Sequence, residues 1–138
     1  MTYLVDANVL SEPTKAVPHV AVLNWLRSHE REVAVDPIIL GELRSGILML
    51  PPGTRRTRLE QWFADGALHL VCIPWDAQTG LRWAELVVHL RASGQSMPVK
   101  DSLIAATALL HDLTVVTRNV TDFQKAGVRL IDPFTIES

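Results

Sequence analysis

The chain has 138 residues, of which 48% are hydrophobic and 20% are charged, and its formal net charge is −2. Domains commonly span about 100–200 residues, so we expect residues 1–138 to form a single domain. This composition excludes disordered, collagen-like and low-complexity proteins. The single cysteine, Cys72, excludes an internal disulfide framework and any zinc site that needs two thiolates.

The sequence favours a cytoplasmic protein without membrane attachment. No apolar run reaches the roughly 18 residues that a membrane span needs. The first residues read MTYLVDANVL, with an acid where a signal peptide keeps its apolar stretch. The near-neutral charge argues against a generic polyanion binder. Ten of the 13 basic residues are arginines, whose side chains suit phosphate, so nucleic-acid binding stays open.

Strand and helix patterns alternate along the chain. Apolar and β-branched runs predict strands, and helical spacing with N-cap and proline signals predicts helices. The predicted strands cover residues 2–6, 33–35, 68–73, 114–117 and 128–131. The predicted helices cover residues 18–30, 36–50, 55–63, 76–91 and 98–111, with a short one possible at 122–127. This alternation predicts an α/β domain with a parallel sheet covered on both faces.

Some residues have simple structural interpretations. Asp36 before Pro37 is predicted to be an N-cap, and Cys72 in a strand is predicted to be a small core residue. The four tryptophans are assigned to core or dimer packing. Leu81 and Val88 fall near one another on the amphipathic helix over 76–91.

Four acids follow strand ends or occupy unusual helix positions. Asp6 ends the first strand, and Thr117 and Asn119 leave the strand over 114–117 in the same direction. Glu42 lies inside an apolar helix, Asp101 in the first turn of an Ala-rich helix, and Asp122 just after Asn119. Ligands of open α/β sheets bind outside the carboxyl ends of the strands, so these carboxylates are predicted to converge there.

A carboxylate cluster repels itself unless a cation lies among its members. Oxygen ligands without thiolates suit Mg²⁺ or Mn²⁺, and such a site is equipped for phosphodiester hydrolysis. Each acid also has a structural alternative: Asp6 and Asp122 as caps, Glu42 paired with Arg44 or Arg118, and Asp101 at a helix N-terminus.

The polar residues near these acids also have two alternative interpretations each. Asn8, Ser11, Thr117 and Asn119 are either turn and cap residues or groups that orient the carboxylates or a water. The basic run with Arg55, Arg56 and Arg58 is either a solvated helix face or a contact to an RNA backbone. Arg44 and Lys100 flank two of the acids and are candidates for steering phosphate.

Four segments together resemble the signatures of PIN-domain ribonucleases. They are YLVDANVLSE at the N-terminus, the mid-chain GELRSGI, the helix MPVKDSLIAATAL and the segment TRNVTDF. The resemblance runs in order from residue 3 to about residue 131, and it is strongest to the VapC toxins of bacterial toxin–antitoxin pairs, including their FitB-like relatives.

This resemblance implies a compact α/β/α sandwich with a central, mainly parallel sheet and a metal-dependent endoribonuclease activity. Its four acids correspond to Asp6, Glu42, Asp101 and Asp122, which would hold Mg²⁺ or Mn²⁺. Similar enzymes leave 5′-phosphate and 3′-hydroxyl ends, and transfer RNA is a common target. The implied partners are a VapB-like antitoxin, which would carry any DNA binding, and a second copy in a homodimer, giving a heterotetramer or larger complex.

Proteins of two other classes, a receiver module and an aspartyl phosphatase, need residues that this chain lacks near Asp6. A phosphoacceptor receiver module needs adjacent acids after its first strand, whereas Asp6 is followed by Ala7 and Asn8. A phosphatase with an aspartyl nucleophile needs a second acid two residues after the first, where Asn8 stands.

Overall fold

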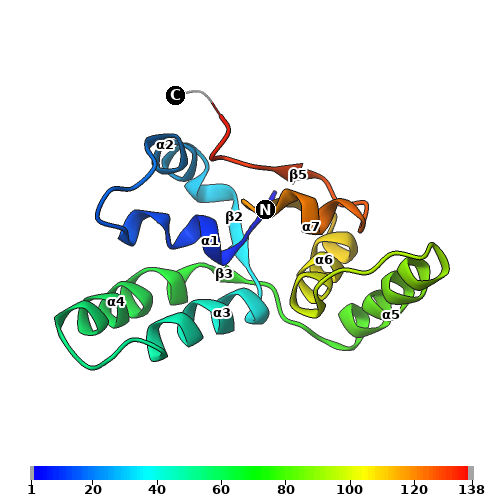
Figure 1. The fold of residues 1–138 in the computed structure, drawn as a ribbon, viewed down its shortest axis with the longest axis horizontal. Helices are drawn as coiled ribbons and strands as arrows, with labels where there is room; N and C mark the ends of the chain where they lie inside the picture. Colours follow the sequence, from blue (N-terminus) through cyan, green and yellow to red (C-terminus); the bar gives the residue numbers. More distant parts are fainter. Residues whose placement is uncertain (1, 137–138) are drawn as a thin grey trace.

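A parallel sheet with helices on both faces forms the centre of the computed structural model, which describes residues 2–136 (Figure 1). Its strand order is β3-β2-β1-β4-β5, and every neighbouring pair is parallel. The strands are β1 Tyr3–Val5, β2 Val33–Val35, β3 Val71–Cys72, β4 Thr114–Val116 and β5 Leu130–Ile131. The predicted α/β/α sandwich with a mainly parallel sheet is confirmed.

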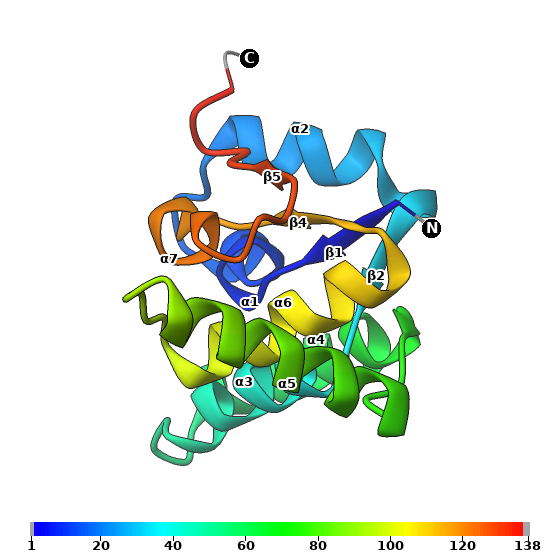
Figure 2. The ribbon, with the colours of Figure 1, turned by 90° about the vertical axis from the view of Figure 1, so that its right-hand side faces the viewer.

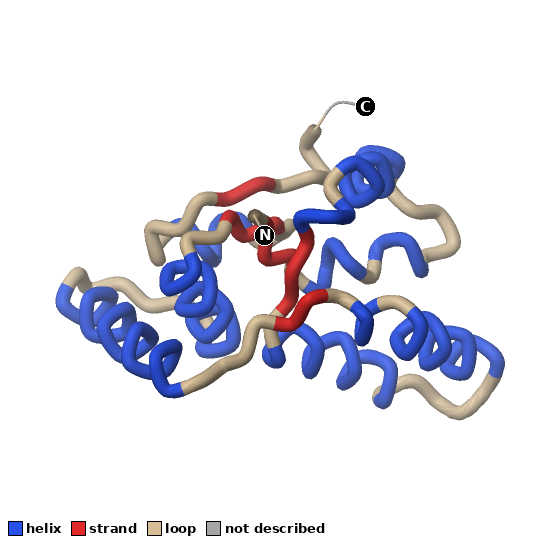
Figure 3. Tube along the Cα trace, turned by 180° about the vertical axis from the view of Figure 1, so that it is seen from behind, coloured by secondary structure: helices blue, strands red, loops and turns tan. Residues whose placement is uncertain are grey.

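Seven α-helices and three 3₁₀-helices surround the sheet in the described part of the chain. The α-helices are α1 Ala7–Leu10, α2 Val20–Ser28, α3 Pro37–Leu48, α4 Thr54–Asp65, α5 Ala77–Ala92, α6 Val99–His111 and α7 Val120–Gln124. The 3₁₀-helices are η1 Glu12–Thr14, η2 Glu30–Glu32 and η3 Ala67–His69. In Figure 2, α2 lies above the sheet and α3, α5 and α6 lie below it. Figure 3 shows from behind how short the strands are beside these helices.

The central strands are apolar along their whole length because they are buried on both faces. Leu4, Val5, Ala34, Val115 and Val116 are all inaccessible to solvent. Such continuous apolar runs are typical of parallel strands covered by helices on each side. The Ala-rich helix α6 also lies in the core, with Ile104, Ala105 and Ala106 inaccessible to solvent.

Asp36 is the N-cap of α3, as predicted. Its Oδ1 accepts a hydrogen bond from the Ile39 amide at 2.9 Å. Its Oδ2 accepts one from the Thr107 hydroxyl of α6 at 2.7 Å, and Asp36 is inaccessible to solvent. This carboxylate therefore joins the start of α3 to the middle of α6.

The order in which successive strands are added to the sheet reverses between β1 and β4. The chain moves outward from β1 to β2 and β3, and then returns to place β4 on the other side of β1. Such a switch point leaves a crevice at the carboxyl ends of the two central strands. In Figure 2, α1 and α7 lie at that end of the sheet.

Several local predictions need correction. Cys72 is exposed, not a core residue, because β3 is an edge strand that pairs only with β2. The strand predicted over 68–73 is reduced to Val71–Cys72 after η3, and the one over 128–131 to Leu130–Ile131. Leu81 and Val88 lie on the exposed side of α5. No helix in residues 2–136 combines the length and apolarity needed to cross a bilayer.

Candidate active site

Asp6 stands at the switch point, between the ends of β1 and β4. Its backbone amide donates to the carbonyl of Val116 at 2.9 Å, which fixes it to β4. Its side chain caps the one-turn helix α1, since Oδ1 accepts from the Ala7 amide at 2.8 Å. The residue is 3% exposed. Burial raises the pKa of the Asp6 carboxyl, and the Glu42 charge adds to this, while the Thr117 hydrogen bond lowers it.

Thr117 and Asn8 hold the second oxygen of Asp6. The Thr117 hydroxyl donates to Asp6 Oδ2 at 2.7 Å, and the Asn8 amide nitrogen lies 3.3 Å from the same oxygen. The Arg118 backbone amide in turn donates to Asn8 Oδ1 at 3.1 Å. These contacts fix the orientation of Asp6 through Asn8, two residues later, and through Thr117 after β4, 111 residues later.

The side chains of Asn119 and Ser11 do not contact the Asp6 carboxylate through hydrogen bonds in the described residues, unlike those of Thr117 and Asn8. The Asn119 backbone amide donates to the Thr117 hydroxyl at 3.0 Å, so it reaches Asp6 only through Thr117. Asn119 is the N-cap residue of α7 without a side-chain cap hydrogen bond. Ser11 ends α1 and lines, together with Asn8, a groove of about 350 Å³, but no hydrogen bond joins its hydroxyl to Asp6 in residues 2–136.

Glu42 comes from the middle of α3 and is bound by Lys100 at the start of α6. Lys100 Nζ donates to Glu42 Oε2 at 2.7 Å, across 58 residues of sequence. The alternative partners considered for Glu42, Arg44 and Arg118, make no ion pair with it among the residues that the structure describes. The other oxygen, Oε1, is buried and has no hydrogen-bond partner in that part of the chain.

Asp101 lies in the first turn of α6 and is 6% exposed. The pKa of its carboxyl is raised to about 6, chiefly by burial and then by the charges of Asp6, Asp122 and Glu42, while the Lys100 charge acts in the opposite direction. No group within residues 2–136 donates a hydrogen bond to this carboxylate. Its ionised form is therefore costly, which is expected for a carboxylate held among like charges.

Asp122 is half-buried in the first turn of α7, close enough for its charge to act on Asp101. The structure thus brings all four predicted acids to the carboxyl edge of the sheet. In residues 2–136, however, no three His, Cys, Asp or Glu side chains as they lie form a group that could hold a metal ion. The acids share one electrostatic environment without forming a ready-made ligand cluster.

The chemistry of the donor set nevertheless fits a divalent cation. All candidate ligands are carboxylate oxygens, which Mg²⁺ and Mn²⁺ prefer. Glu42 Oε1 is a buried oxygen lacking a donor, and Asp101 carries a raised carboxyl pKa without one. A cation placed among them would satisfy the first and favour ionisation of the second.

The sequence does not predict the ion pair between Lys100 and Glu42, and it indicates Lys100 only as a candidate for steering phosphate. Nothing local in the sequence indicates that α3 and α6 lie side by side at these two positions. Glu42, singled out because it lies mid-helix without a capping role, was the better signal. Glu42 is half-buried with one oxygen fully buried, and the partner of its charge comes from the other helix.

Comparison with known proteins gives consistent matches. The PIN domain family matches residues 3–128. The chain is 33% identical to the VapC ribonuclease Y4jK of Sinorhizobium fredii, covering 95% of this chain and 96% of that protein. It is 33% identical to toxin FitB of Neisseria gonorrhoeae, covering 95% and 97%. The structure of FitAB bound to an IR36 DNA fragment superposes with a TM-score of 0.91 at 30% identity, covering 99% of each chain.

Proposed function

The chain belongs to the PIN domain family, and from this premise we propose that it is a Mg²⁺- or Mn²⁺-dependent endoribonuclease, the toxin of a toxin–antitoxin pair. The names of two similar proteins, a VapC ribonuclease and a toxin, support both halves of this proposal. Transfer RNA is the substrate class to test first.

One structural observation carries the proposal. Asp101, a buried carboxylate without a hydrogen-bond donor in the described chain, lies among the charges of Asp6, Asp122 and Glu42 at the switch point of the sheet. An arrangement that disfavours ionisation is a stability cost that a purely structural site has no reason to keep. It suits a site whose carboxylates bind a cation and a phosphate.

Each residue then has a role that its contacts support. Asp6, Glu42, Asp101 and Asp122 would hold the cation, while Thr117 and Asn8 keep Asp6 in position. When bound, the cation activates water as a Lewis acid and neutralises charge that develops on the phosphate oxygens.

The proposal extends to partners. FitB-like chains were solved with FitA on a DNA fragment, and we infer a comparable antitoxin here, with DNA contacts made by that partner. A homodimer within a heterotetramer or larger complex is part of the same proposal. Leu81 and Val88, which are 64% and 66% exposed on α5, offer apolar surface for such contacts.

The family match also decides against the two other classes that were weighed. A receiver module or an aspartyl phosphatase would need a second acid near Asp6, but Asn8 occupies that position and bonds to Asp6 and Thr117. Neither alternative explains why the acids of α3, α6 and α7 lie at the same edge.

The test compares matched acid-to-amide substitutions in the purified 138-residue chain. Glu42→Gln should abolish cleavage of transfer RNA, because it removes a carboxylate from the cluster. Glu85→Gln, on the exposed side of α5, should cleave as the unaltered chain does. Cleavage should stop in EDTA and return with excess Mg²⁺ or Mn²⁺. Full activity of Glu42→Gln, with contaminating nuclease excluded, would refute the proposal.

A further inference from the structure

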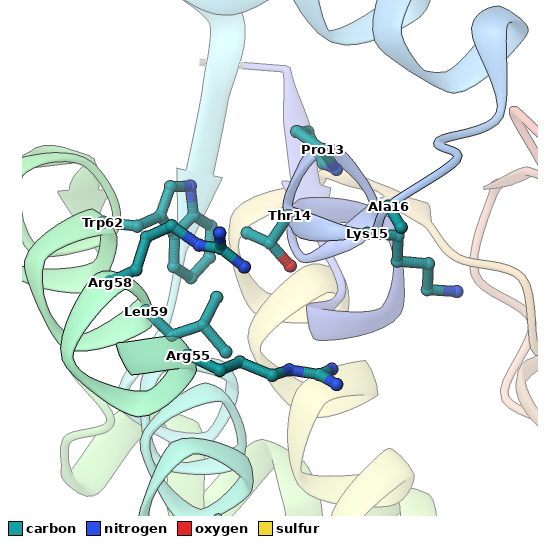
Figure 4. A pocket seen from close by; sticks show the side chains of 8 residues that line it. All are labelled: Pro13, Thr14, Lys15, Ala16, Arg55, Arg58, Leu59 and Trp62. Carbon is teal, nitrogen blue, oxygen red and sulfur yellow. The ribbon is translucent and has the colours of Figure 1, made fainter. Parts of the chain in front are cut away.

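A pocket of about 580 Å³ lies between η1 and the first turns of α4, and we call it the η1–α4 pocket (Figure 4). This volume is within the roughly 300–1,000 Å³ typical of small-molecule sites. It is lined by three cationic residues, no acidic residue and one tryptophan: Pro13, Thr14, Lys15, Ala16, Arg55, Arg58, Leu59 and Trp62. Figure 4 shows Arg55 and Arg58 extending from α4 towards the segment of Thr14.

This pocket continues into the candidate active site. A neighbouring groove of about 350 Å³ shares Lys15, Arg55 and Trp62 with the η1–α4 pocket. The same groove is also lined by Asn8 and Glu42, two residues of the carboxylate edge. A chain lying in the groove would therefore pass from the carboxylates directly to the arginines.

The arginines of this pocket stand at the unfavourable end of their helix. The N-terminus of a helix carries a partial positive charge, which disfavours cations in its first turns. Arg56 offsets this through Glu60, 2.8 Å away, and through the carbonyl of Leu50. Arg55 and Arg58 have no ion pair within residues 2–136. They are two exposed cations without a structural role that the fold would explain.

In the described part of the chain, Trp62 lacks the hydrogen bond that two other tryptophans make through the indole N–H. Trp75 donates to the Leu103 carbonyl and Trp83 to the Ser102 hydroxyl. Trp62 is half-buried, and its indole N–H has no acceptor among the residues that the structure describes. It lines the pocket with an aromatic ring, the kind of side chain on which a nucleic-acid base stacks.

Lys15 contributes less positive charge than its position suggests. Its Nζ lies 2.9 Å from Glu12 Oε1, and Glu12 is buried behind it. In Figure 4 its side chain extends away from the two arginines. Arg55 and Arg58 are therefore the cations available for an anionic ligand.

We propose that the η1–α4 pocket binds a nucleotide of a single-stranded RNA segment beside the cleaved bond, with Arg55 and Arg58 on phosphate and Trp62 on the base. Arginine suits phosphate because its planar guanidinium donates two parallel hydrogen bonds. The base of this nucleotide would stack on the aromatic ring of Trp62. The RNA backbone would run from the carboxylate edge into the pocket, because the two are joined by the groove that Asn8, Glu42 and Arg55 line. This inference rests on the proposed ribonuclease function and places part of its substrate.

The first test measures RNA binding separately from cleavage. The full-length chain carrying Asp101→Asn, to prevent cleavage, is titrated with a labelled single-stranded oligoribonucleotide at several salt concentrations. Each phosphate contact on a single strand contributes about 0.7 to the slope of log K against log salt. Adding Arg55→Ala and Arg58→Ala should weaken binding about tenfold and lower the slope by about 1.4.

The control removes the same charge from the opposite edge of the sheet. Arg27 lies in the last turn of α2 and Arg31 in η2, just before the amino end of β2. Arg27→Ala with Arg31→Ala should change binding less than twofold. If the two double variants weaken binding equally, only overall charge matters and the pocket is not a nucleotide site.

Trp62 and turnover give independent readouts. Trp62→Phe keeps a ring and Trp62→Leu does not, so only the leucine variant should lose fivefold or more in affinity, provided both unfold at similar temperatures. In the active chain, Arg55→Ala with Arg58→Ala should raise KM about tenfold while kcat stays within about threefold.

The results separate this inference from the proposed function. If the unaltered chain cleaves RNA, but the Arg55 and Arg58 double variant has the same KM, RNA affinity and salt slope, the pocket assignment is wrong. The proposed nuclease function is then unaffected. If the double variant loses affinity for an antitoxin and keeps its affinity for RNA, the pocket is a protein-docking site. If the chain cleaves no RNA, the nuclease proposal fails, and the binding titration still decides the pocket.

Discussion

Asp101→Asn should stabilise the fold while it destroys the proposed activity. Asparagine nearly matches aspartate in shape but carries no charge. It therefore removes a buried anion, since burial and then the charges of Asp6, Asp122 and Glu42 raise the pKa of the Asp101 carboxyl. In the absence of divalent cations, we expect the variant to have the larger free energy of unfolding at pH 7.5.

The magnitude follows from the pKa of about 6 in the folded protein against the ordinary value of 3.8. At 1.36 kcal/mol per pH unit, this difference sets an upper limit of about 3 kcal/mol. The edge opens to solvent and salt screens its charges, so we expect about 1–2 kcal/mol. Because the folded pKa is raised, the penalty is absent below pH 3.8, grows between pH 3.8 and 6, and is complete above pH 6.

Urea unfolding in EDTA at pH 4.5 and pH 7.5 measures this effect. The stability gap between Asp101→Asn and the unaltered chain should be largest at pH 7.5 and shrink at pH 4.5. Asp65→Asn, at the exposed end of α4, is the matched control and should show little change at either pH. Millimolar Mg²⁺ should stabilise the unaltered chain more than Asp101→Asn. A variant that is less stable at pH 7.5, or a gap independent of pH, would contradict the reasoning.

Three further outcomes follow from the same contacts. Asp36→Ala removes the side chain that caps α3 at the Ile39 amide, and it leaves the Thr107 hydroxyl unpaired in the core. Urea unfolding should therefore show that the free energy of unfolding falls by about 2–4 kcal/mol. Thr117→Val removes the hydrogen bond that lowers the Asp6 carboxyl pKa. Cleavage should fall about 10–100-fold, more at pH 6 than at pH 8 in a pH–rate profile. Calorimetric titration should detect Mg²⁺ binding to the EDTA-stripped chain and little to Asp101→Asn.

The sequence predicts well what is decided by local pattern. The apolar runs of β1, β2 and β4 and the cap at Asp36 depend on neighbouring residues, and the structure has them where expected. The meeting of Asp6 and Thr117 was predictable as well, because parallel strands end at one edge of a sheet.

What the sequence does not predict depends on which elements become neighbours. Cys72 looks like a core residue in an apolar run, but whether a strand is central or at the edge is decided by the whole sheet. The ion pair of Glu42 with Lys100 needs α3 beside α6, which no local pattern encodes. The short helix α1 was missed because Asp6 acts both as a strand-end residue and as its N-cap.

The two halves of the proposed substrate site are positioned by different parts of the fold. Asp6 and Thr117 are fixed by the buried strands β1 and β4, whose pairing cannot shift without exposing core residues. Glu42 and Arg55 come from α3 and α4, which follow one another in the chain and pack together. The distance from the carboxylates to the η1–α4 pocket therefore depends on how the α3–α4 pair sits against the sheet. Since Lys100 and Asp36 both join α3 to α6, these two contacts keep the cleavage chemistry in register with the pocket that we assign to RNA.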